Sequence, residues 1–230
     1  MTFVMSDPAF SRTERLLGGA VLQRLHESHV AVFGIGGVGS FTAEALARTG
    51  VGRLTLIDMD TVCESNLNRQ LVALRSTFGR LKTDVMAERI RDIHPAAHVT
   101  TRPVFYSRET ADTFDLRTFD HIADAMDTVD AKIELIVRAR QVGTPVISCM
   151  GAGNKLDPTR FEVAPLSATS VCPLCKVMRR RLKEHGIEEV PVVFSREPPL
   201  QRQPPPGSFV CATAAAGLIL AAEIITTLAR

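Results

Sequence analysis

The sequence predicts an α/β fold built on a doubly wound, mostly parallel sheet. Short apolar segments typical of strands alternate along the chain with segments of helical periodicity, as in proteins made of βαβ units. In addition, the region 30–58 reads as strand, glycine-rich turn, helix, strand and acidic residue, an order typical of Rossmann-like nucleotide-binding folds. A chain of 230 residues suits one such unit, so we expect a single domain over 1–230.

The first predicted strand, 29–33, runs directly into a glycine-rich turn that reads GIGGVG at 34–39. Glycines let the backbone turn tightly and approach a phosphate, and the free N–H groups at the start of the following helix, 40–49, favour an anion. A second strand, 53–57, ends at Asp58, 19 residues after the last of these glycines, where a carboxylate can accept hydrogen bonds from ribose hydroxyls. A nucleotide site is therefore predicted, and its loop glycines are Gly34, Gly36, Gly37 and Gly39.

A polar block after the second strand indicates which nucleotide is bound. A dehydrogenase needs no such block, whereas a site that handles a triphosphate needs fixed cations against the charge developing on phosphate oxygens. We expect Arg69 and Lys82 to neutralise the α-phosphate and the pyrophosphate leaving group, and Asn66 and Gln70 to be supporting donors. Asp60 has two interpretations, as a site residue or as the acid that holds Arg69.

Further predicted elements continue the alternation: a helix over 83–93, a strand over 98–105, a short helix or turn over 108–114, a strand over 121–127, a helix over 131–142 and a strand over 145–150. In parallel sheets ligands lie beyond the carboxyl ends of the strands, where Gly36, Asp58 and Asp127 would gather. Mg²⁺ at nucleotide sites is commonly held by one or two carboxylates together with phosphate oxygens, and Asp127 is the candidate ligand. Asp124 points to a different side of its strand.

Outside the nucleotide-binding core of 29–150 we expect a helical segment over 8–28 and a different C-terminal region over 151–230. There, 154–165 predicts an antiparallel addition to the sheet, 172–185 a basic helix and 212–228 an apolar helix. The segment 191–207 holds six of the thirteen prolines, so we expect a mobile crossover loop over the active face and neither helix nor central strand.

Composition sets further limits. The net charge of +2 neither requires nor excludes a polyanionic partner. Five cysteines, an odd number, and an N-terminus without a signal peptide predict a cytoplasmic protein. No uninterrupted apolar run reaches the length of a membrane span. The apolar helix comes closest, but Glu223 and several threonines interrupt it, so a buried or subunit-contact helix is expected in place of a membrane anchor.

The motif CPLC at 172–175 has three interpretations: a structural zinc site, a redox or thioester site, or packing cysteines at a helix start. A closed zinc site needs four ligands, and the sequence offers no second CxxC pair. Packing cysteines are therefore the expectation, since no cysteine has a clear activating neighbour in the sequence.

Four motifs, taken as a set, resemble those of the E1-like adenylating family: GxGGxG, DxD, SNxxRQ and a lysine a dozen residues further on. Within that family, five stretches are similar to the tRNA threonylcarbamoyladenosine dehydratases, namely 33–40, 43–50, 124–128, 151–158 and 169–174. The protein-activating branch has aspartate-asparagine and then an arginine at the fifth place after the aspartate, where this chain has Asp127, Thr128 and Lys132. The resemblance covers nearly the whole chain and is weakest in the proline-rich segment.

The resemblance implies ATP- and Mg²⁺-dependent cyclisation of the threonylcarbamoyl group on the adenosine beside a tRNA anticodon, with Arg69, Lys82 and Asp127 as catalytic residues. It also implies a homodimer in which Arg12, or Arg15 if the register differs, reaches the ATP phosphates of the partner subunit. The partner is then tRNA, with a sulfur-transfer protein left open as another. Arg179, Arg180 and Arg181 of the basic helix are the candidate tRNA contacts, although charge runs are commonly solvated helix faces.

Three other functions remain open from the residues alone. The first is an adenylyltransferase that activates the C-terminus of a ubiquitin-like sulfur carrier, against which the missing second CxxC and Lys132 argue. The second is an NAD-dependent oxidoreductase that uses the glycine-rich turn. The third is a nucleotide-sensing or interaction module without turnover.

Overall fold

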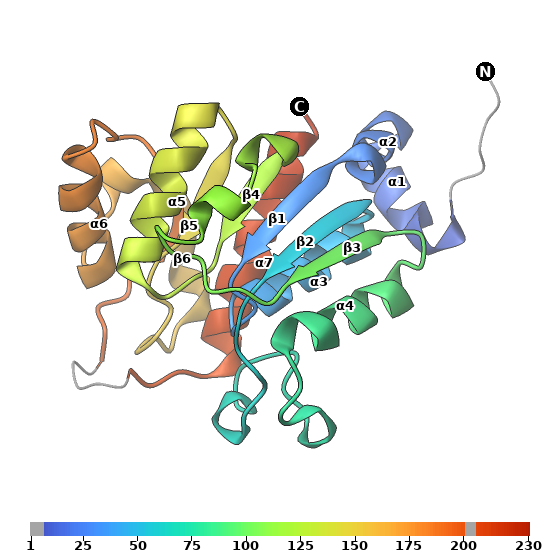
Figure 1. Ribbon diagram of the computed structural model, residues 1–230, viewed down its shortest axis with the longest axis horizontal. Helices are drawn as coiled ribbons and strands as arrows, with labels where there is room; N and C mark the ends of the chain where they lie inside the picture. The colour runs from blue at the N-terminus through green and yellow to red at the C-terminus, as the bar shows by residue number, and fades with distance from the viewer. Residues whose placement is uncertain (1–6, 201–205) are drawn as a thin grey trace.

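A computed structural model describes residues 7–200 and 206–230 and is built around one seven-stranded sheet (Figure 1). The strand order is β3-β2-β1-β4-β5-β7-β6, and the described strands are parallel to their neighbours except where β6 meets β7. From β1 the chain builds the sheet outward in one direction through β2 and β3, and in the other direction from β4 onward. Doubly wound sheets bind ligands at this switch point between β1 and β4. The predicted fold is confirmed. The strands are β1 (His29–Phe33), β2 (Arg53–Ile57), β3 (His98–Arg102), β4 (His121–Asp124), β5 (Val146–Cys149), β6 (Phe161–Pro165) and β7 (Pro191–Ser195).

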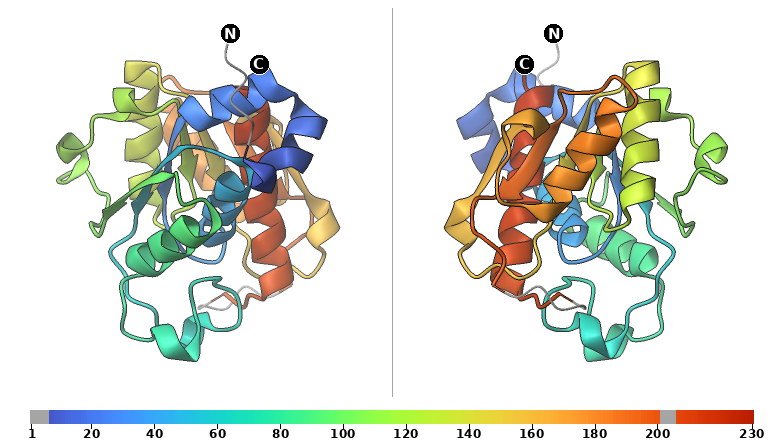
Figure 2. Two further views of the ribbon diagram at one scale, coloured as in Figure 1. Left: turned by 90° about the vertical axis from the view of Figure 1, so that its right-hand side faces the viewer. Right: turned by 90° about the vertical axis from the view of Figure 1, so that its left-hand side faces the viewer.

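Helices cover both faces of the sheet, as the two side views in Figure 2 show. One face packs against α2, α3, α4 and α7, and the other packs against α5 and α6. Alternate residues of β1 explain the two layers, because Val30 and Val32 belong to the first core and Ala31 and Phe33 to the second. The helices are α1 (Ser11–Leu17), α2 (Gly19–Glu27), α3 (Gly39–Thr49), α4 (Lys82–Ile93), α5 (Val129–Val142), α6 (Pro173–Lys183) and α7 (Val210–Leu228).

One expectation about the C-terminal region is wrong. The proline-rich segment 191–207 begins with β7, which lies inside the sheet between β5 and β6. Its apolar residues Val192, Val193 and Phe194 are buried on the two faces. Pro191 is tolerated because it is the first residue of the strand, where a missing N–H costs least. Of the expected crossover loop, residues 201–205 lie outside the described part of the chain.

Other elements differ from expectation mainly at their ends. β3 stops at Arg102 instead of 105, and β4 stops at Asp124, so that Asp127 lies in the loop beyond the strand. The antiparallel addition expected over 154–165 is β6, which is confined to Phe161–Pro165.

The apolar helix α7 is long and apolar enough, by length and composition, to cross a membrane. In this structure it packs lengthwise against α3 and the sheet and buries residues such as Ala216, Leu220 and Ile224. Gly217 is required at the closest approach, since a Cβ there would lie 2.3 Å from the Val38 carbonyl oxygen. Thr42 Oγ1 also donates a hydrogen bond to the Gly217 oxygen at 3.0 Å. These contacts identify α7 as a core helix, as expected.

Candidate active site

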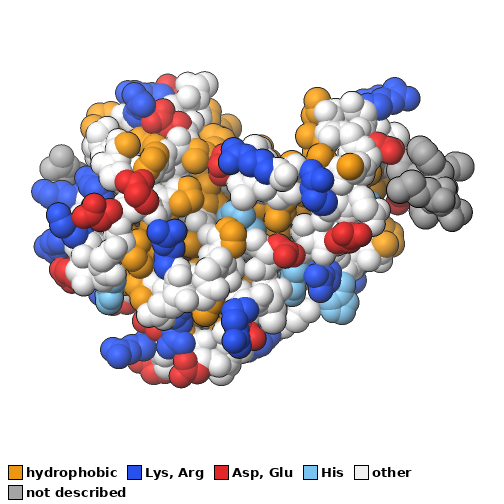
Figure 3. Space-filling view, turned by 90° about the horizontal axis from the view of Figure 1, so that it is seen from above, with side chains coloured by type: hydrophobic (Ala, Val, Ile, Leu, Met, Phe, Trp, Pro, Cys, Tyr) orange, Lys and Arg blue, Asp and Glu red, His pale blue; other side chains and the backbone are white. Residues whose placement is uncertain are grey.

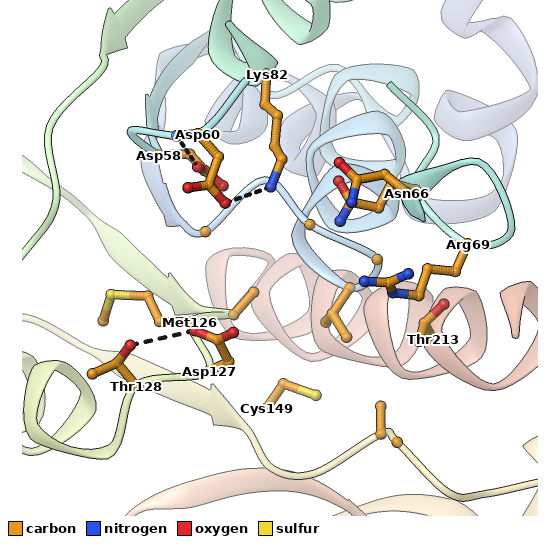
Figure 4. A pocket seen from close by; sticks show the side chains of 18 of the residues that line it. Asp58, Asp60, Asn66, Arg69, Lys82, Met126, Asp127, Thr128, Cys149 and Thr213 are labelled. Atoms are coloured by element: carbon orange, nitrogen blue, oxygen red, sulfur yellow. Dashed lines mark hydrogen bonds and ion pairs between the residues drawn. The ribbon is translucent and has the colours of Figure 1, made fainter. Parts of the chain in front are cut away.

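A cavity of about 600 Å³ opens at the carboxyl ends of β1, β2, β4 and β5. This volume is in the range of ordinary ligand pockets. Its lining combines the glycine loop after β1, the acids after β2, the turn after β4 and the loop after β5. Gly36, Asp58 and Asp127 therefore gather at one edge of the sheet, as expected. Figure 4 shows Lys82, Arg69 and Asp127 placed around this one cavity.

The glycine loop is shaped by close backbone contacts. Gly34 has φ +89°, and a Cβ there would lie 2.7 Å from the Ala125 carbonyl oxygen. A Cβ on Gly39 would lie 1.7 Å from the Gly34 oxygen, so Gly39 is needed for packing of α3 against the loop. Gly34, Gly36 and Gly37 line the cavity, whereas Gly39 lies behind it.

Asp58 links the end of β2 to the glycine loop. Its Oδ2 accepts a hydrogen bond from the Ile35 N–H at 2.7 Å, and its Oδ1 accepts one from the Asp60 N–H at 2.8 Å. Burial raises the pKa of the Asp58 carboxyl, an effect that nearby Lys82 opposes. The carboxylate thus fixes the loop and still faces the cavity.

Lys82 and Asp60 form an ion pair at the cavity wall, with 2.7 Å between Nζ and Oδ2. The lysine is 4% exposed, although its partner carboxylate is largely in solvent. Its position is fixed at the start of α4 by a short antiparallel contact between Thr61 and Leu81. A buried cation facing a cavity, with one exposed carboxylate beside it, is placed to receive an anionic ligand.

The alternative in which Asp60 holds Arg69 is therefore wrong. Arg69 Nη1 instead donates to the Ser65 carbonyl oxygen and to Asn68 Oδ1, both at 2.9 Å. Neither partner is a carboxylate, so the positive charge of the guanidinium is not neutralised by them. Figure 4 shows this side chain directed toward the cavity.

Two amides lie beneath these charges. Asn66 is buried, and its Oδ1 accepts the Cys63 N–H at 3.1 Å, which holds the turn that carries Arg69. Gln70 is 8% exposed and lines the cavity, and its Oε1 has no hydrogen-bond partner within the described protein. A buried acceptor without a partner at a cavity wall is suited to a ligand donor.

Asp127 and Asp124 have different surroundings. Asp127 is exposed to the cavity, and Thr128 Oγ1 is a distant donor to it at 3.4 Å. Unlike Asp60, it has no ion pair among the described residues, and such an accessible carboxylate beside a phosphate-binding loop fits the usual protein contribution to Mg²⁺ at nucleotide sites. Asp124 is fully buried and paired with Lys132, whose Nζ also donates to the Cys149 carbonyl oxygen at 2.7 Å. Lys132 thereby joins the ends of β4 and β5 under the cavity floor.

Some predicted site residues lie away from the cavity. Arg12 is exposed on α1 and does not line it. Of the three arginines on α6, Arg179 donates to the Thr169 carbonyl oxygen at 2.9 Å, and Arg181 forms an ion pair with Asp130. Arg180 projects into solvent.

The cysteines form no metal site, since no group of three or more His, Cys, Asp or Glu side chains in the described residues could hold an ion. Cys172 and Cys175 are both buried in the core against α5, as packing cysteines would be. The expectation that no cysteine has an activating neighbour is wrong for Cys172. Contact with the Cys175 thiol and with the backbone N–H groups at the start of α6 lowers the pKa of Cys172.

Several cavity residues were not identified from the sequence. Apolar side chains after β3 and β4, the residues 149–153, and Thr213 of α7 also line the cavity. The strand-end position was a usable signal for the first two groups. Thr213 carried no signal, because it reaches the cavity only through the packing of α7 on the glycine loop, 3.2 Å from a Cβ built on Gly37.

A family model described as the ThiF family matches residues 10–230. The chain belongs to the ThiF family. It is 42% identical to the tRNA threonylcarbamoyladenosine dehydratase of Bacillus subtilis (strain 168), over 96% of this chain and 94% of that protein.

Solved structures of a second relative are similar to this chain over nearly its whole length. The Escherichia coli tRNA N6-threonylcarbamoyladenosine dehydratase TcdA in complex with AMP superposes with a TM-score of 0.93 and 38% identity, covering 99% of this chain and 97% of that chain. Its complex with ATP gives a TM-score of 0.91 and 39% identity, covering 96% and 93%. The likeness thus extends over essentially all of both proteins.

Proposed function

We propose that this ThiF-family protein uses ATP to dehydrate, and so cyclise, the threonylcarbamoyl group on the adenosine next to the anticodon of tRNA. One combined observation carries the proposal. The cavity gathers a phosphate-type glycine loop, Arg69, Lys82 and Asp127 in a chain that matches named dehydratases almost end to end.

The chemistry follows from the weakness of a carboxylate as an electrophile, because its leaving group would be oxide. ATP converts the threonyl carboxylate into an activated acyl adenylate or acyl phosphate, which has a good leaving group. The neighbouring carbamoyl group then attacks the activated carbonyl carbon within the same substrate and closes the ring. Proximity favours this intramolecular step, so no enzyme nucleophile is required.

Each cavity residue has a role in this reaction. The N–H groups of the glycine loop and the start of α3 bind phosphate, and Asp58 accepts hydrogen bonds from the ribose. Arg69 and Lys82 stabilise the charge that develops on the α-phosphate and on the leaving group. Gln70 and Asn66 support the ligand and the Arg69 turn respectively, and Asp60 holds Lys82 in position.

Asp127 would hold Mg²⁺, since it is a cavity carboxylate that, unlike Asp60, is not ion-paired with Lys82. When bound, the ion neutralises phosphate charge. The proposal also includes a homodimer, in which Arg12 of α1, which does not line the cavity of its own chain, reaches the phosphates in a partner subunit. A reducing cytoplasm is the proposed location, where tRNA and ATP are available.

The tRNA is proposed to contact the exposed face of α6. Lys176, Arg180 and Lys183 follow one another at spacings of four and three residues and are all exposed, so they share one side of the helix. Figure 3 shows Lys and Arg side chains gathered at the left edge of the molecule, where α6 lies in Figure 1. This face replaces the three consecutive arginines as the proposed contact, because Arg179 and Arg181 are held by partners within the protein, whereas Lys176 and Arg180 have no ion pair among the described residues. Lys183 has only a long ion pair with the exposed Glu188, at 3.8 Å.

The proposal is tested with purified protein, ATP, Mg²⁺ and tRNA that carries threonylcarbamoyladenosine. We expect the nucleoside released from this tRNA to become lighter by one water, only when ATP is present. A parallel reaction contains a ubiquitin-like carrier that ends in Gly-Gly. Pyrophosphate release with the carrier, together with unchanged tRNA, would instead identify a carrier adenylyltransferase.

A further inference from the structure

The two cysteines of the CPLC motif lie side by side at the start of α6. Cys172 is the residue that precedes the helix, and Cys175 lies in its first turn. Cys172 is 5% exposed and Cys175 is fully buried. The Cys175 thiol is directed at the Cys172 sulfur, and the two cysteines are not joined by a disulfide.

The protein backbone favours negative charge on the Cys172 sulfur. The N–H groups of Gly151, Leu174 and Cys175 face this atom, although none makes a regular capping hydrogen bond to it. The 11-residue helix adds the positive end of its dipole. Contact with Cys175 is the largest cause that lowers the pKa of Cys172, and the same contact, with burial, raises the pKa of Cys175. One sulfur is therefore set up as a thiolate and the other as a thiol.

The thiolate lies directly behind the wall of the nucleotide cavity. Gly151 and Leu174 both line that cavity, and a Cβ built on Gly151 would lie 3.9 Å from the Cys172 sulfur. Val171, a non-glycine residue at φ +51°, forms the tight turn that brings Cys172 to this position. With only 5% of Cys172 exposed, the sulfur is closed to a bulky reagent, and only a small solute fits the access that is left.

We propose that Cys172 and Cys175 form a reversible dithiol–disulfide site in the cavity wall, oxidised by hydrogen peroxide or another small hydroperoxide. The site is independent of the proposed function. Two features of the geometry separate it from ordinary packing cysteines. The CxxC spacing places Cys172 just before α6 and Cys175 in its first turn, and the Cys172 sulfur lies against the cavity wall at Gly151. Cys149 provides the contrast, because its thiol lies outside the CxxC pair and burial is the main cause that raises its pKa to about 12.

The reaction balances in two steps. The Cys172 thiolate attacks one peroxide oxygen, the O–O bond breaks, and the departing hydroxide takes up a proton, which leaves a sulfenic acid on Cys172. The Cys175 sulfur then attacks the Cys172 sulfur, the S–S bond forms, the S–O bond breaks, and water leaves with the thiol proton. Two thiols lose two electrons in total, and one hydrogen peroxide is reduced to two waters.

The test uses the intact wild-type protein treated with hydrogen peroxide and then digested with trypsin. Both cysteines fall in the tryptic peptide Phe161–Lys176. We expect this peptide to become two hydrogens lighter, to recover its mass on reduction, and to react about tenfold faster than the exposed Cys211 is oxidised. A bulky maleimide should label Cys211 and leave Cys172 unlabelled.

Variants assign the order of the two sulfurs. Cys175→Ala should stop at a sulfenic acid on Cys172 that dimedone traps, Cys172→Ala should abolish peroxide chemistry at Cys175, and the control Cys211→Ala should still form the disulfide. The proposal is overturned if the wild-type peptide keeps both thiols while Cys211 is oxidised. It is equally overturned if dimedone labels Cys175 in the Cys172→Ala protein. The wild-type measurement decides the question even if a variant fails to fold.

Discussion

Lys132 and Asp124 form an ion pair in which both side chains are completely buried beneath the candidate active site. Lys132 Nζ lies 3.1 Å from Asp124 Oδ2, and the same carboxylate oxygen accepts a hydrogen bond from Ser148 Oγ at 2.6 Å. The other carboxylate oxygen accepts the Met126 N–H at 3.2 Å, in the turn that presents Asp127 to the cavity. The pair therefore supports the turn after β4 and the carboxyl end of β5.

The first prediction concerns this pair. Lys132→Met leaves a buried carboxylate without its cation, so we expect a loss of about 3–5 kcal/mol in the free energy of unfolding. Removing both charges in Lys132→Met/Asp124→Asn should restore much of that loss. Urea denaturation of the two variants and the wild type measures the difference. If Lys132→Met alone unfolds at the wild-type urea concentration, the pair has no such role.

Lys82 is predicted to act in catalysis more than in stability. Lys82→Met removes a cation that meets charge developing on phosphate oxygens, and we expect kcat to fall by about two to three orders of magnitude. The matched control is Arg80→Met, since Arg80 is exposed and paired with Glu88 away from the cavity. Steady-state kinetics of ring closure give kcat for both variants and the wild type. Equal losses in the two variants would contradict a specific role for Lys82.

Asp127 is predicted to set the Mg²⁺ requirement. Asp127→Asn weakens a hard-cation ligand, so the Mg²⁺ concentration for half-maximal rate should rise about tenfold or more, at an unchanged Tm. Asp92→Asn is the control, because this acid is exposed on α4 and does not line the cavity. A Mg²⁺ titration of the rate makes the comparison. An unaltered titration curve for Asp127→Asn would exclude it as a ligand.

The basic face of α6 is predicted to contact the tRNA backbone. Each phosphate contact contributes about 0.7–0.9 to the slope of log affinity against log salt. Lys176→Glu/Arg180→Glu should therefore weaken tRNA binding about tenfold or more and reduce that slope by about one to two. Arg53→Glu is the control, since this exposed arginine begins β2 at the opposite end of the strands from the cavity. Filter binding over a series of salt concentrations measures both quantities. An unchanged slope in the variant would show that this face of α6 does not contact the tRNA.

Glu44 gives a prediction for acid stability. Burial opposes ionisation of Glu44, but its ion pairs with Arg89 and Arg48 outweigh this effect and hold the pKa of its carboxyl below the usual value. A carboxyl with a lowered folded-state pKa stabilises the fold above its unfolded pKa of about 4.3, and this contribution is lost as the pH falls through the folded pKa.

Glu44→Gln should accordingly reduce stability at neutral pH by about 1–3 kcal/mol. The difference from wild type should shrink as the solution is acidified below about pH 4. Thermal melts across this pH range measure it, with Glu88→Gln as the exposed control. A difference that stays constant with pH would show that the charge of Glu44 is not responsible.

Local patterns were enough to predict the fold up to β5, because each strand, glycine turn and amphipathic helix has its own sequence signal. They failed at β7. The many prolines of 191–207 led to the prediction of a loop, although the segment contains the short apolar run Val192–Phe194 that forms the strand. The placement of the strand-end residues Gly36, Asp58 and Asp127 was also predictable, since parallel strands align their carboxyl ends.

Side-chain pairing was not predictable in the same way. The ion pair between Lys82 and Asp60 depends on how distant segments pack together. The same is true of the N–H groups near the Cys172 sulfur. Gly151 and the first residue of α6, Pro173, are 22 positions apart in the chain, and no local pattern places one beside the other. Tertiary contacts of this kind have no signature in a single sequence.

The central claim is that ATP activates the threonyl carboxylate, and isotope transfer tests it most directly. The substrate is tRNA whose threonyl carboxylate oxygens carry a heavy oxygen isotope, and the nucleotide products of a completed reaction are analysed by mass spectrometry. We predict that one heavy oxygen per cyclised substrate appears in AMP, for an adenylate, or in inorganic phosphate, for an acyl phosphate. Cyclised tRNA formed without heavy oxygen in either product would contradict the account.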